Sequence, residues 1–237
     1  MPIYSFEEGT PRIAPTAYVD PSAVIIGRVF VGDGCYVAPG AVMRGDWGEV
    51  IMCEGSNLQD NAVVHARPEE TTYLGPASHV GHGAILHGCR LEGHVLVGMG
   101  AVINDGAVLE EGSIVASGAV VLPGMRVPAR TLVAGVPAEE KSRVDDVRDA
   151  FFWMGTRLYQ GLPERYRCAC REISREEAER RYAESPGGSL NAHGDLLSSQ
   201  PTASNPARMR AVPPRRPAFT FSPSSNHPQK RDMGATR

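Results

Sequence analysis

The sequence predicts an all-β fold, a parallel β-solenoid, and two observations carry this prediction. An aliphatic residue stands at every sixth position from residue 91 to residue 133, and a small residue follows most of these four positions later. An amphipathic helix or a two-stranded hairpin has a different period, whereas a triangular coil with one hexapeptide on each face has this one. The aliphatic positions are Leu91, Val97, Ile103, Leu109, Val115, Val121, Val127 and Val133.

The same aliphatic ladder continues toward the N-terminus, with three irregular steps. Three extra residues follow Met43, four follow Val64, and one is missing between Leu86 and Leu91. We interpret the extra residues as loops, so the coil covers residues 10–138 in about seven turns, stacked about 4.8 Å apart. The earlier ladder positions are Ile13, Val19, Val31, Val37, Met43, Met52, Leu58, Val64, Leu74, Val80 and Leu86. The glycines expected at corners, where a positive φ costs least, are Gly93, Gly106, Gly112 and Gly118.

Composition narrows the class of protein. The chain has 237 residues, of which 42% are hydrophobic and 6% aromatic, which suits a narrow aliphatic prism. A net charge of −3 gives no electrostatic basis for binding nucleic acid or a membrane surface. No apolar run reaches membrane-spanning length and the N-terminus lacks leader features, so we expect a cytoplasmic protein. The five cysteines are scattered and odd in number, which indicates reduced thiols.

The chain divides into three predicted parts: a solenoid domain over 1–140, a helical segment over 141–184 and a disordered tail over 185–237. Residues 142–161 show helical spacing of apolar residues, and we expect this stripe to pack along the outside of the prism. A shorter helix is expected after Ser174, whose spacing to Glu177 fits a capping box. The tail is rich in Pro, Ser, Asn and Arg and has almost no periodicity. The apolar stripe is Val144, Val147, Phe151, Met154 and Leu158.

The hexapeptide register places two histidines above one another. His65 and His87 are separated by 22 residues, one turn plus the four-residue insertion after Val64. They therefore occupy equivalent outward positions on one face, with backbones about 4.8 Å apart. Two imidazoles at that separation can share one metal ion, with Zn–N bonds of about 2.0–2.1 Å.

The same register defines two columns of polar residues on different faces. Arg44 falls in the column of His65 and His87, whereas Asp60 falls beneath His82 on another face. The two columns can meet only if a neighbouring subunit of a threefold assembly presents the second face. A cation, a carboxylate and three imidazoles in one cleft would suit metal-assisted hydrolysis. The alternative is that these histidines are solvated surface residues.

Five segments together resemble the signature of the γ-class carbonic anhydrase family. They are MRGD at 43–46, NLQDN at 57–61, VH at 64–65, VGHGAILHGC at 80–89 and VGMGA at 97–101. The opening MPIY, together with GT at 155–156 and YQ at 159–160, is more narrowly similar to the hexapeptide proteins of phenylacetic acid degradation and the carnitine pathway. The resemblance covers about residues 1–170 and leaves the tail outside it.

The resemblance implies a left-handed parallel β-helix that forms a homotrimer, with Zn2+ or Fe2+ at each subunit interface. It implies that His65 and His87 of one chain and His82 of its neighbour bind the metal. Gln59 matches a glutamine that contacts the metal-bound water, and Asn57 lies in the same motif. The charged residues that tie the subunits together match Arg44, Asp46 and Asp60.

One position departs from the family pattern. The prototype has a proton-shuttling glutamate immediately after the residue that matches Asp46, and here that position is Trp47. Glu49, or Glu69 in the loop after His65, is a candidate substitute. The resemblance therefore implies the metal site more strongly than it implies fast carbon dioxide hydration.

Three functions are compatible with these residues. The first is a metal-dependent lyase or hydrolase that uses a metal-bound hydroxide on carbon dioxide or on an acyl-CoA thioester. The second is a CoA-dependent hexapeptide acyltransferase in which a histidine acts as general base without a metal. The third is a metal-bound trimer without catalytic activity. We expect the first, because a base requires only one histidine and three converge here.

Overall fold

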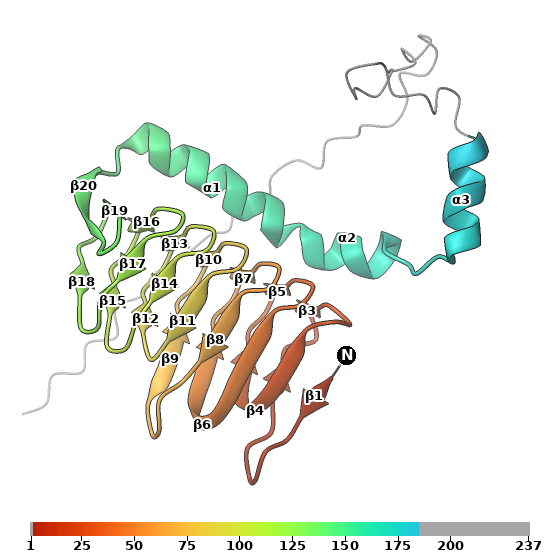
Figure 1. The fold of residues 1–237 in the computed structure, drawn as a ribbon, viewed down its shortest axis with the longest axis horizontal. Helices are drawn as coiled ribbons and strands as arrows, with labels where there is room; N and C mark the ends of the chain where they lie inside the picture. The colour runs from red at the N-terminus through yellow and green to blue at the C-terminus, as the bar shows by residue number, and fades with distance from the viewer. Residues whose placement is uncertain (1, 185–237) are drawn as a thin grey trace, which may run out of the picture. The chain divides into compact units, whose positions relative to one another are not determined.

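The structure, a computed structural model, describes residues 2–184 and divides into two compact units, Met1–Glu172 and Ile173–Arg237. The first unit is the predicted left-handed parallel β-helix with helices along one side (Figure 1). Strand pairing is parallel throughout, except where β19 and β20 pair antiparallel at the C-terminal end of the coil. The predicted tail over 185–237 lies outside the described residues.

Two faces of the coil join into one sheet, because β4 and β6 are long enough to span both. The three extra residues after Met43 lengthen β6, and the four after Val64 form the connection between β8 and β9. This sheet contains β1 (Ile3–Tyr4), β2 (Arg12–Ile13), β4 (Val24–Val31), β6 (Val42–Met52), β8 (Val63–His65), β9 (Thr71–Leu74), β11 (Ile85–His87), β12 (Arg90–Leu91), β14 (Val102–Ile103), β15 (Val108–Leu109), β17 (Val120–Val121) and β18 (Arg126–Val127).

The third face is a separate sheet that lies under the helices. It contains β3 (Tyr18–Val19), β5 (Tyr36–Val37), β7 (Asn57–Leu58), β10 (His79–Val80), β13 (Leu96–Val97), β16 (Ile114–Val115), β19 (Thr131–Ala134) and β20 (Glu139–Arg143). Most strands are only two residues long, because each must turn a corner of the prism within six residues.

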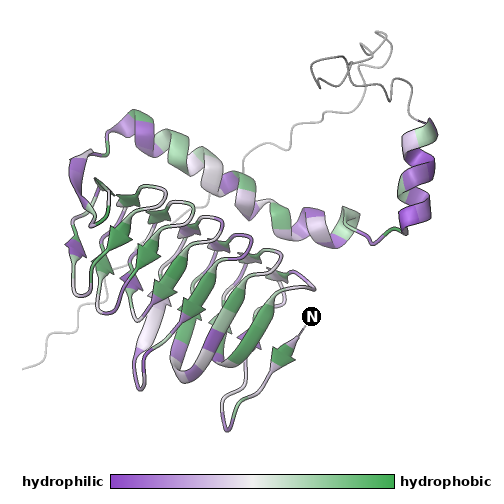
Figure 2. Cartoon of the chain, in the orientation of Figure 1, coloured by the Kyte–Doolittle hydropathy of each residue, from purple (hydrophilic) through white to green (hydrophobic). Residues whose placement is uncertain are grey.

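The predicted ladder forms the core. Every ladder residue from Leu91 to Val133 is fully buried, and hydrophobic strands alternate with more hydrophilic corners along the coil (Figure 2). Ile25 is also fully buried, although the ladder read from the sequence leaves it out. Among the predicted corner glycines, Gly106 has a φ of +67°, but Gly93 does not have a positive φ. The neighbouring His94 takes the left-handed conformation instead, at +53°.

Helix α1 (Asp146–Gln160) packs on the third face, but not through the predicted stripe. Residues 139–143 form strand β20, so the helix begins later than predicted and is capped by Asp145, whose carboxylate accepts from the Arg148 N–H at 2.8 Å. Of the predicted stripe only Val144 is buried, and it precedes the helix. The residues that α1 buries are Phe152 and Thr156, so the predicted packing face is wrong.

Two further helices follow. Helix α2 (Leu162–Ala169) continues along the same side, where the ring of Tyr166 packs at a tilt against those of Tyr18 and Tyr36, with centroids 5.0 and 5.3 Å apart. Helix α3 (Arg175–Glu184) belongs to the second unit. Its predicted cap is confirmed, because the Ser174 hydroxyl accepts from the Glu177 N–H at 3.1 Å. No helix among residues 2–184 is long and apolar enough to span a bilayer.

Candidate functional site

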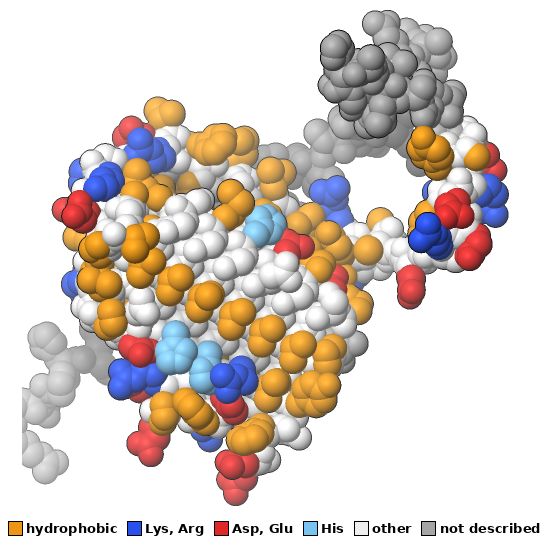
Figure 3. All heavy atoms as spheres, in the orientation of Figure 1, with side chains coloured by type: hydrophobic (Ala, Val, Ile, Leu, Met, Phe, Trp, Pro, Cys, Tyr) orange, Lys and Arg blue, Asp and Glu red, His pale blue; other side chains and the backbone are white. Residues whose placement is uncertain are grey.

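The predicted column of Arg44, His65 and His87 is present on the exposed face of the larger sheet. Strand pairing places Arg44 opposite His65, and His65 opposite His87. The Nε2 atom of His87 lies 3.1 Å from Nδ1 of His65, and Arg44 approaches the same Nδ1 atom at 3.4 Å. Figure 3 shows a pair of histidines among basic and acidic side chains on this face.

Each histidine of this pair contacts a carboxylate through its other ring nitrogen. The Nε2 atom of His65 lies 2.9 Å from Asp46, and the Nδ1 atom of His87 lies 2.5 Å from Asp105. A carboxylate on one ring nitrogen fixes the ring's orientation and tautomer and makes the opposite nitrogen more basic. The two nitrogens that remain are those that face each other.

Asp46 joins the guanidinium of Arg44 to the imidazole of His65. Burial raises the pKa of Asp46, but hydrogen bonds from His65 and Arg44 outweigh this and hold the pKa below its ordinary value. Asp46 is therefore an anion at neutral pH. Its neighbour Trp47 lies over His65, with ring centroids 5.5 Å apart, and remains exposed to solvent.

The predicted contact between His82 and Asp60 is present at a corner of the coil. The Nδ1 atom of His82 lies 2.7 Å from Oδ2 of Asp60, and both side chains are more than two-fifths exposed. No hydrogen-bond partner occupies Nε2 of His82 within the described part of the chain. The third histidine thus also has a carboxylate on one ring nitrogen, but its other nitrogen is open, whereas those of His65 and His87 contact each other.

The structure does not bring His82 to the pair of His65 and His87 within one chain. Among residues 2–184, no three His, Cys, Asp or Glu side chains are grouped so that they could hold a metal ion. A site that uses all three histidines therefore requires a second subunit. The shared arrangement inferred from the hexapeptide register stays a prediction.

Asn57 and Gln59 lie on the third face, beneath α1, and not beside the histidine pair. The Gln59 amide donates to Oδ1 of Asn57 at 2.9 Å and lies 2.6 Å from Nε2 of His79. Burial, followed by the positive charges of His82 and His94, lowers the pKa of His79 to about 4. In this chain the two amides hold a neutral, partly buried histidine. Their role beside a metal-bound water stays a prediction.

The two candidate replacements for the missing glutamate differ in their surroundings. Glu49 forms an ion pair with Arg12 at 3.6 Å. Glu69 lines an open cavity together with Asp46 and Trp47. Of the two, only Glu69 shares a cavity with a residue that contacts His65.

Asp105 and His79 were not identified from the sequence as parts of a polar cluster. Asp105 follows His87 by 18 residues, about one turn of the coil, so the repeat itself carries a signal for it. His79 pairs with Asn57 across strands β10 and β7, and this pairing also follows from the register.

The histidine pair fits a metal ion by its donor set. Two nitrogens bound tetrahedrally to one zinc ion lie about 3.3 Å apart, given Zn–N bonds of about 2.0–2.1 Å, and the two open nitrogens here are 3.1 Å apart. Carboxylates on the outer nitrogens are the usual support of metal-binding histidines. His65 and His87 therefore supply two suitable ligands, and the chain supplies a third, His82, at a corner.

No family model matches the chain. It is 45% identical over 174 residues to the carnitine operon protein CaiE of Escherichia coli O1:K1, covering 73% of this chain and 88% of that protein. The corresponding protein of E. coli K12 is 44% identical over 164 residues. The chain belongs to the hexapeptide-repeat family that includes CaiE. The narrower resemblance to carnitine-pathway proteins is confirmed.

Two solved structures are similar over most of the solenoid. One is a hexapeptide transferase family protein from Anaplasma phagocytophilum, with a TM-score of 0.67 and 33% identity over 70% of this chain and 98% of that one. The other is a putative acetyltransferase from Bacillus cereus, with a TM-score of 0.68 and 31% identity over 69% of this chain and 95% of that one.

These relatives correct the expected enzyme class. The sequence led us to expect a metal-dependent lyase or hydrolase, but the two solved structures described above, at 33% and 31% identity, are described as transferases. The expectation of carbon dioxide hydration or thioester hydrolysis is therefore wrong. That expectation gave the three histidines a catalytic role, and this role requires a complete metal site. The described residues of one chain do not form such a site.

Proposed function

We propose that the protein transfers an acyl group from a coenzyme A thioester to a small acceptor, at a site formed between subunits. The names of the two solved relatives support this class of reaction. The observation in the chain itself that carries the proposal is the pair of His82 and Asp60. Their 2.7 Å contact orients the imidazole, and Nε2 is left open on a solvent-accessible corner.

The pair supplies the proton transfers that acyl transfer needs. Nε2 of His82 takes the proton from the acceptor's hydroxyl or amine as the acceptor attacks the thioester carbonyl carbon. The carbon–sulfur bond then breaks, the new ester or amide bond remains, and the thiolate of coenzyme A takes the proton from His82. Asp60 holds the ring and stabilises its protonated form during the reaction.

A row of outward-facing aliphatic residues supports the assembly of several copies. These residues follow one column across successive turns, two positions before the column of Arg44, His65 and His87. A continuous row of hydrophobic side chains crosses this face in Figure 3. Exposed apolar surface beside a polar cluster is typical of an interface. The row is Val24, Val42, Val63, Ile85, Val102 and Val120.

Turnover of acetyl-CoA with a panel of small hydroxyl and amine acceptors tests the proposal, with release of the free thiol as the readout. His82→Asn is expected to lower kcat about 10²–10⁴-fold while the KM for acetyl-CoA changes little. Asp60→Asn is expected to lower kcat less, because the ring loses its support but keeps its basic nitrogen. Glu54→Gln, an exposed carboxylate outside these clusters, serves as the control. Unchanged turnover in His82→Asn, or no acceptor-dependent thiol release, would contradict the proposal.

A second candidate function is metal binding, favoured by the carboxylates behind His65 and His87. In that case His82 of a neighbouring subunit would complete the ligand set, with Zn2+ or Fe2+ as the ion. Acyl transfer requires Nε2 of His82 to accept a proton, whereas the metal site requires the same nitrogen to bind the metal. One nitrogen cannot do both at once. Metal content of the purified trimer distinguishes the two functions.

A further inference from the structure

A cavity of about 550 Å³ opens next to the histidine column, lined by residues of one turn, two strands and one connection. Phe6 and Glu7 come from the turn after β1, Arg28 from β4, and Asp46 and Trp47 from the middle of β6. Pro68 and Glu69 come from the connection between β8 and β9. Asp46 lines this cavity and also contacts His65 at 2.9 Å, so the cavity and the histidine column share one side chain.

Aromatic rings form part of the wall. Trp47 is 57% exposed and Phe6 is 42% exposed, although both are large hydrophobic side chains. The ring face of a tryptophan is the strongest aromatic partner for a cation, because the negative end of its quadrupole lies there. A flat ring that is open to a cavity is therefore available for a cationic group.

The charges of the lining favour a cation as well. Three carboxylates, Glu7, Asp46 and Glu69, face one guanidinium, that of Arg28. Arg28 donates to the carbonyl oxygens of Trp47 at 3.1 Å and Gly48 at 3.4 Å, so its hydrogen bonds are made to the backbone and not to a carboxylate. Within the described residues neither Glu7 nor Glu69 forms an ion pair.

We propose that the cavity lined by Trp47, Phe6, Glu7 and Glu69 binds an organic ammonium group. Aromatic rings supply the surface for a methylated or otherwise weakly hydrated cation, and the two unpaired carboxylates supply the charge. An anionic ligand would meet the unpaired carboxylates of Glu7 and Glu69, beside that of Asp46, which is already paired with Arg44. If the proposed function holds, this cation is part of the acyl acceptor, and that step alone rests on the proposed function. The binding of the cation does not depend on it.

Calorimetric titration of the full-length protein with choline tests the site. The neutral analogue 3,3-dimethyl-1-butanol has the same shape without the charge and serves as the matched ligand. We expect choline to bind at least tenfold more tightly than this analogue, and its affinity to fall as the salt concentration rises. Both ligands binding equally, or choline not binding at millimolar concentration, would overturn the proposal.

Variants show whether changes in choline affinity arise at the cavity or from substitutions elsewhere in the protein. Trp47→Ala is expected to weaken choline binding about fivefold to thirtyfold, the range of a cation–π contact, and Trp47→Phe should restore part of it. Glu69→Gln should weaken binding about threefold by removing one unpaired charge. The controls are Phe151→Ala and Glu54→Gln, an aromatic residue and a carboxylate that do not line the cavity. Equal losses in the controls would place the binding elsewhere and overturn the assignment.

The outcomes also separate this proposal from acyl transfer. Binding of choline without transfer to any acceptor would support the cavity and contradict the proposed function. Transfer to neutral acceptors without binding of choline would do the reverse. Thermal unfolding of each variant shows whether a loss of affinity reflects the cavity or the fold, and Trp47→Phe keeps the test decisive should Trp47→Ala not fold.

Discussion

His79 is a partly buried histidine held neutral by its surroundings. Its ring lies between the amides of Asn57 and Gln59 and the edges of Phe152 and Tyr159 in α1. Burial, with the charges of His82 and His94, lowers its pKa from 6.5 to about 4. Protonation would place a charge under the helix where no carboxylate contacts the ring.

This shift predicts a loss of stability in mild acid. Between pH 6.5 and 4 the unfolded chain binds a proton at His79 that the folded chain does not, so stability present above pH 6.5 is lost as the pH falls. From pH 7 to pH 5, His79 is expected to contribute a loss of about 1–2 kcal/mol in the free energy of unfolding. Urea unfolding at both pH values measures it. In His79→Gln this part of the loss in unfolding free energy between pH 7 and pH 5 should vanish. An equal loss in the variant and the wild type would show that the loss does not come from His79.

Single residues of the site could be placed from the sequence where the repeat determines their position. The pairing of Arg44, His65 and His87 follows from counting turns, and the structure confirms it. The repeat does not determine which polar neighbour a side chain selects. Gln59 turns toward His79 because both lie outward on the face that α1 covers, and that cover is not visible in the hexapeptide pattern.

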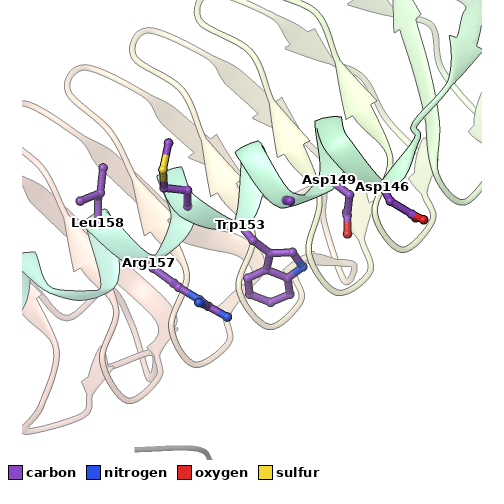
Figure 4. A pocket seen from close by; sticks show the side chains of 7 residues that line it. Asp146, Asp149, Trp153, Arg157 and Leu158 are labelled. Atoms are coloured by element: carbon purple, nitrogen blue, oxygen red, sulfur yellow. The ribbon is translucent and has the colours of Figure 1, made fainter. Parts of the chain in front are cut away.

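At the scale of elements, α1 presents an exposed apolar face. Val147, Phe151, Met154 and Leu158 are all more than half exposed. Asp149 and Trp153 point to one side of the helix and Leu158 to another (Figure 4). The buried face instead stacks aromatic rings on histidines, with Trp153 and Phe152 at 3.8 and 4.2 Å from the ring of His94.

Two adjacent phenylalanines test this orientation. Phe152 is 4% exposed and Phe151 is 72% exposed, so Phe152→Ala should cost about 3 kcal/mol of unfolding free energy. Phe151→Ala should cost less than about 0.5 kcal/mol. Urea unfolding of both variants at one protein concentration gives the comparison. A similar cost at both positions would show that the outer face of α1 is covered in solution.

The spacing of apolar residues predicted the helix but selected the wrong face. Phe152, Thr156 and Tyr159 recur with the same helical period as Phe151, Met154 and Leu158. The stripe that packs inward lies opposite a row of histidines and tyrosines on the third face, and not opposite an aliphatic surface. A polar and aromatic helix face therefore packs inward, against the usual expectation from hydrophobicity.

At the scale of the whole molecule, the solenoid was predictable because each turn repeats the same pattern of inward aliphatic residues. The ladder residues stack on their equivalents in the next turn, so one period in the sequence specifies about seven turns of structure. The functional site lacks this redundancy. It combines residues from different faces, and the distance between those faces in an assembly depends on an interface that a single chain does not contain.

The last prediction concerns that interface and uses two variants that each lack part of the proposed metal site. One chain carries His82→Ala, and the other carries both His65→Ala and His87→Ala. If the three ligands come from two neighbouring chains, homotrimers of either variant should bind no metal at this site. In a mixed trimer, His65 and His87 of the first variant meet His82 of the second at one interface.

A closed ring of three that contains both chain types has one such interface, whatever their ratio. If the second candidate function, metal binding, is right, co-refolded and separated mixed trimers should recover up to one zinc ion per trimer, measured by elemental analysis. Wild-type trimers refolded in the same way would then hold three and control for the procedure. Because the open nitrogens of His65 and His87 are only 3.1 Å apart, the recovered site needs no further rearrangement of that pair. Verified mixed trimers without zinc, beside loaded wild-type trimers, would reject a ligand set shared between subunits and leave His82 free to act as the base.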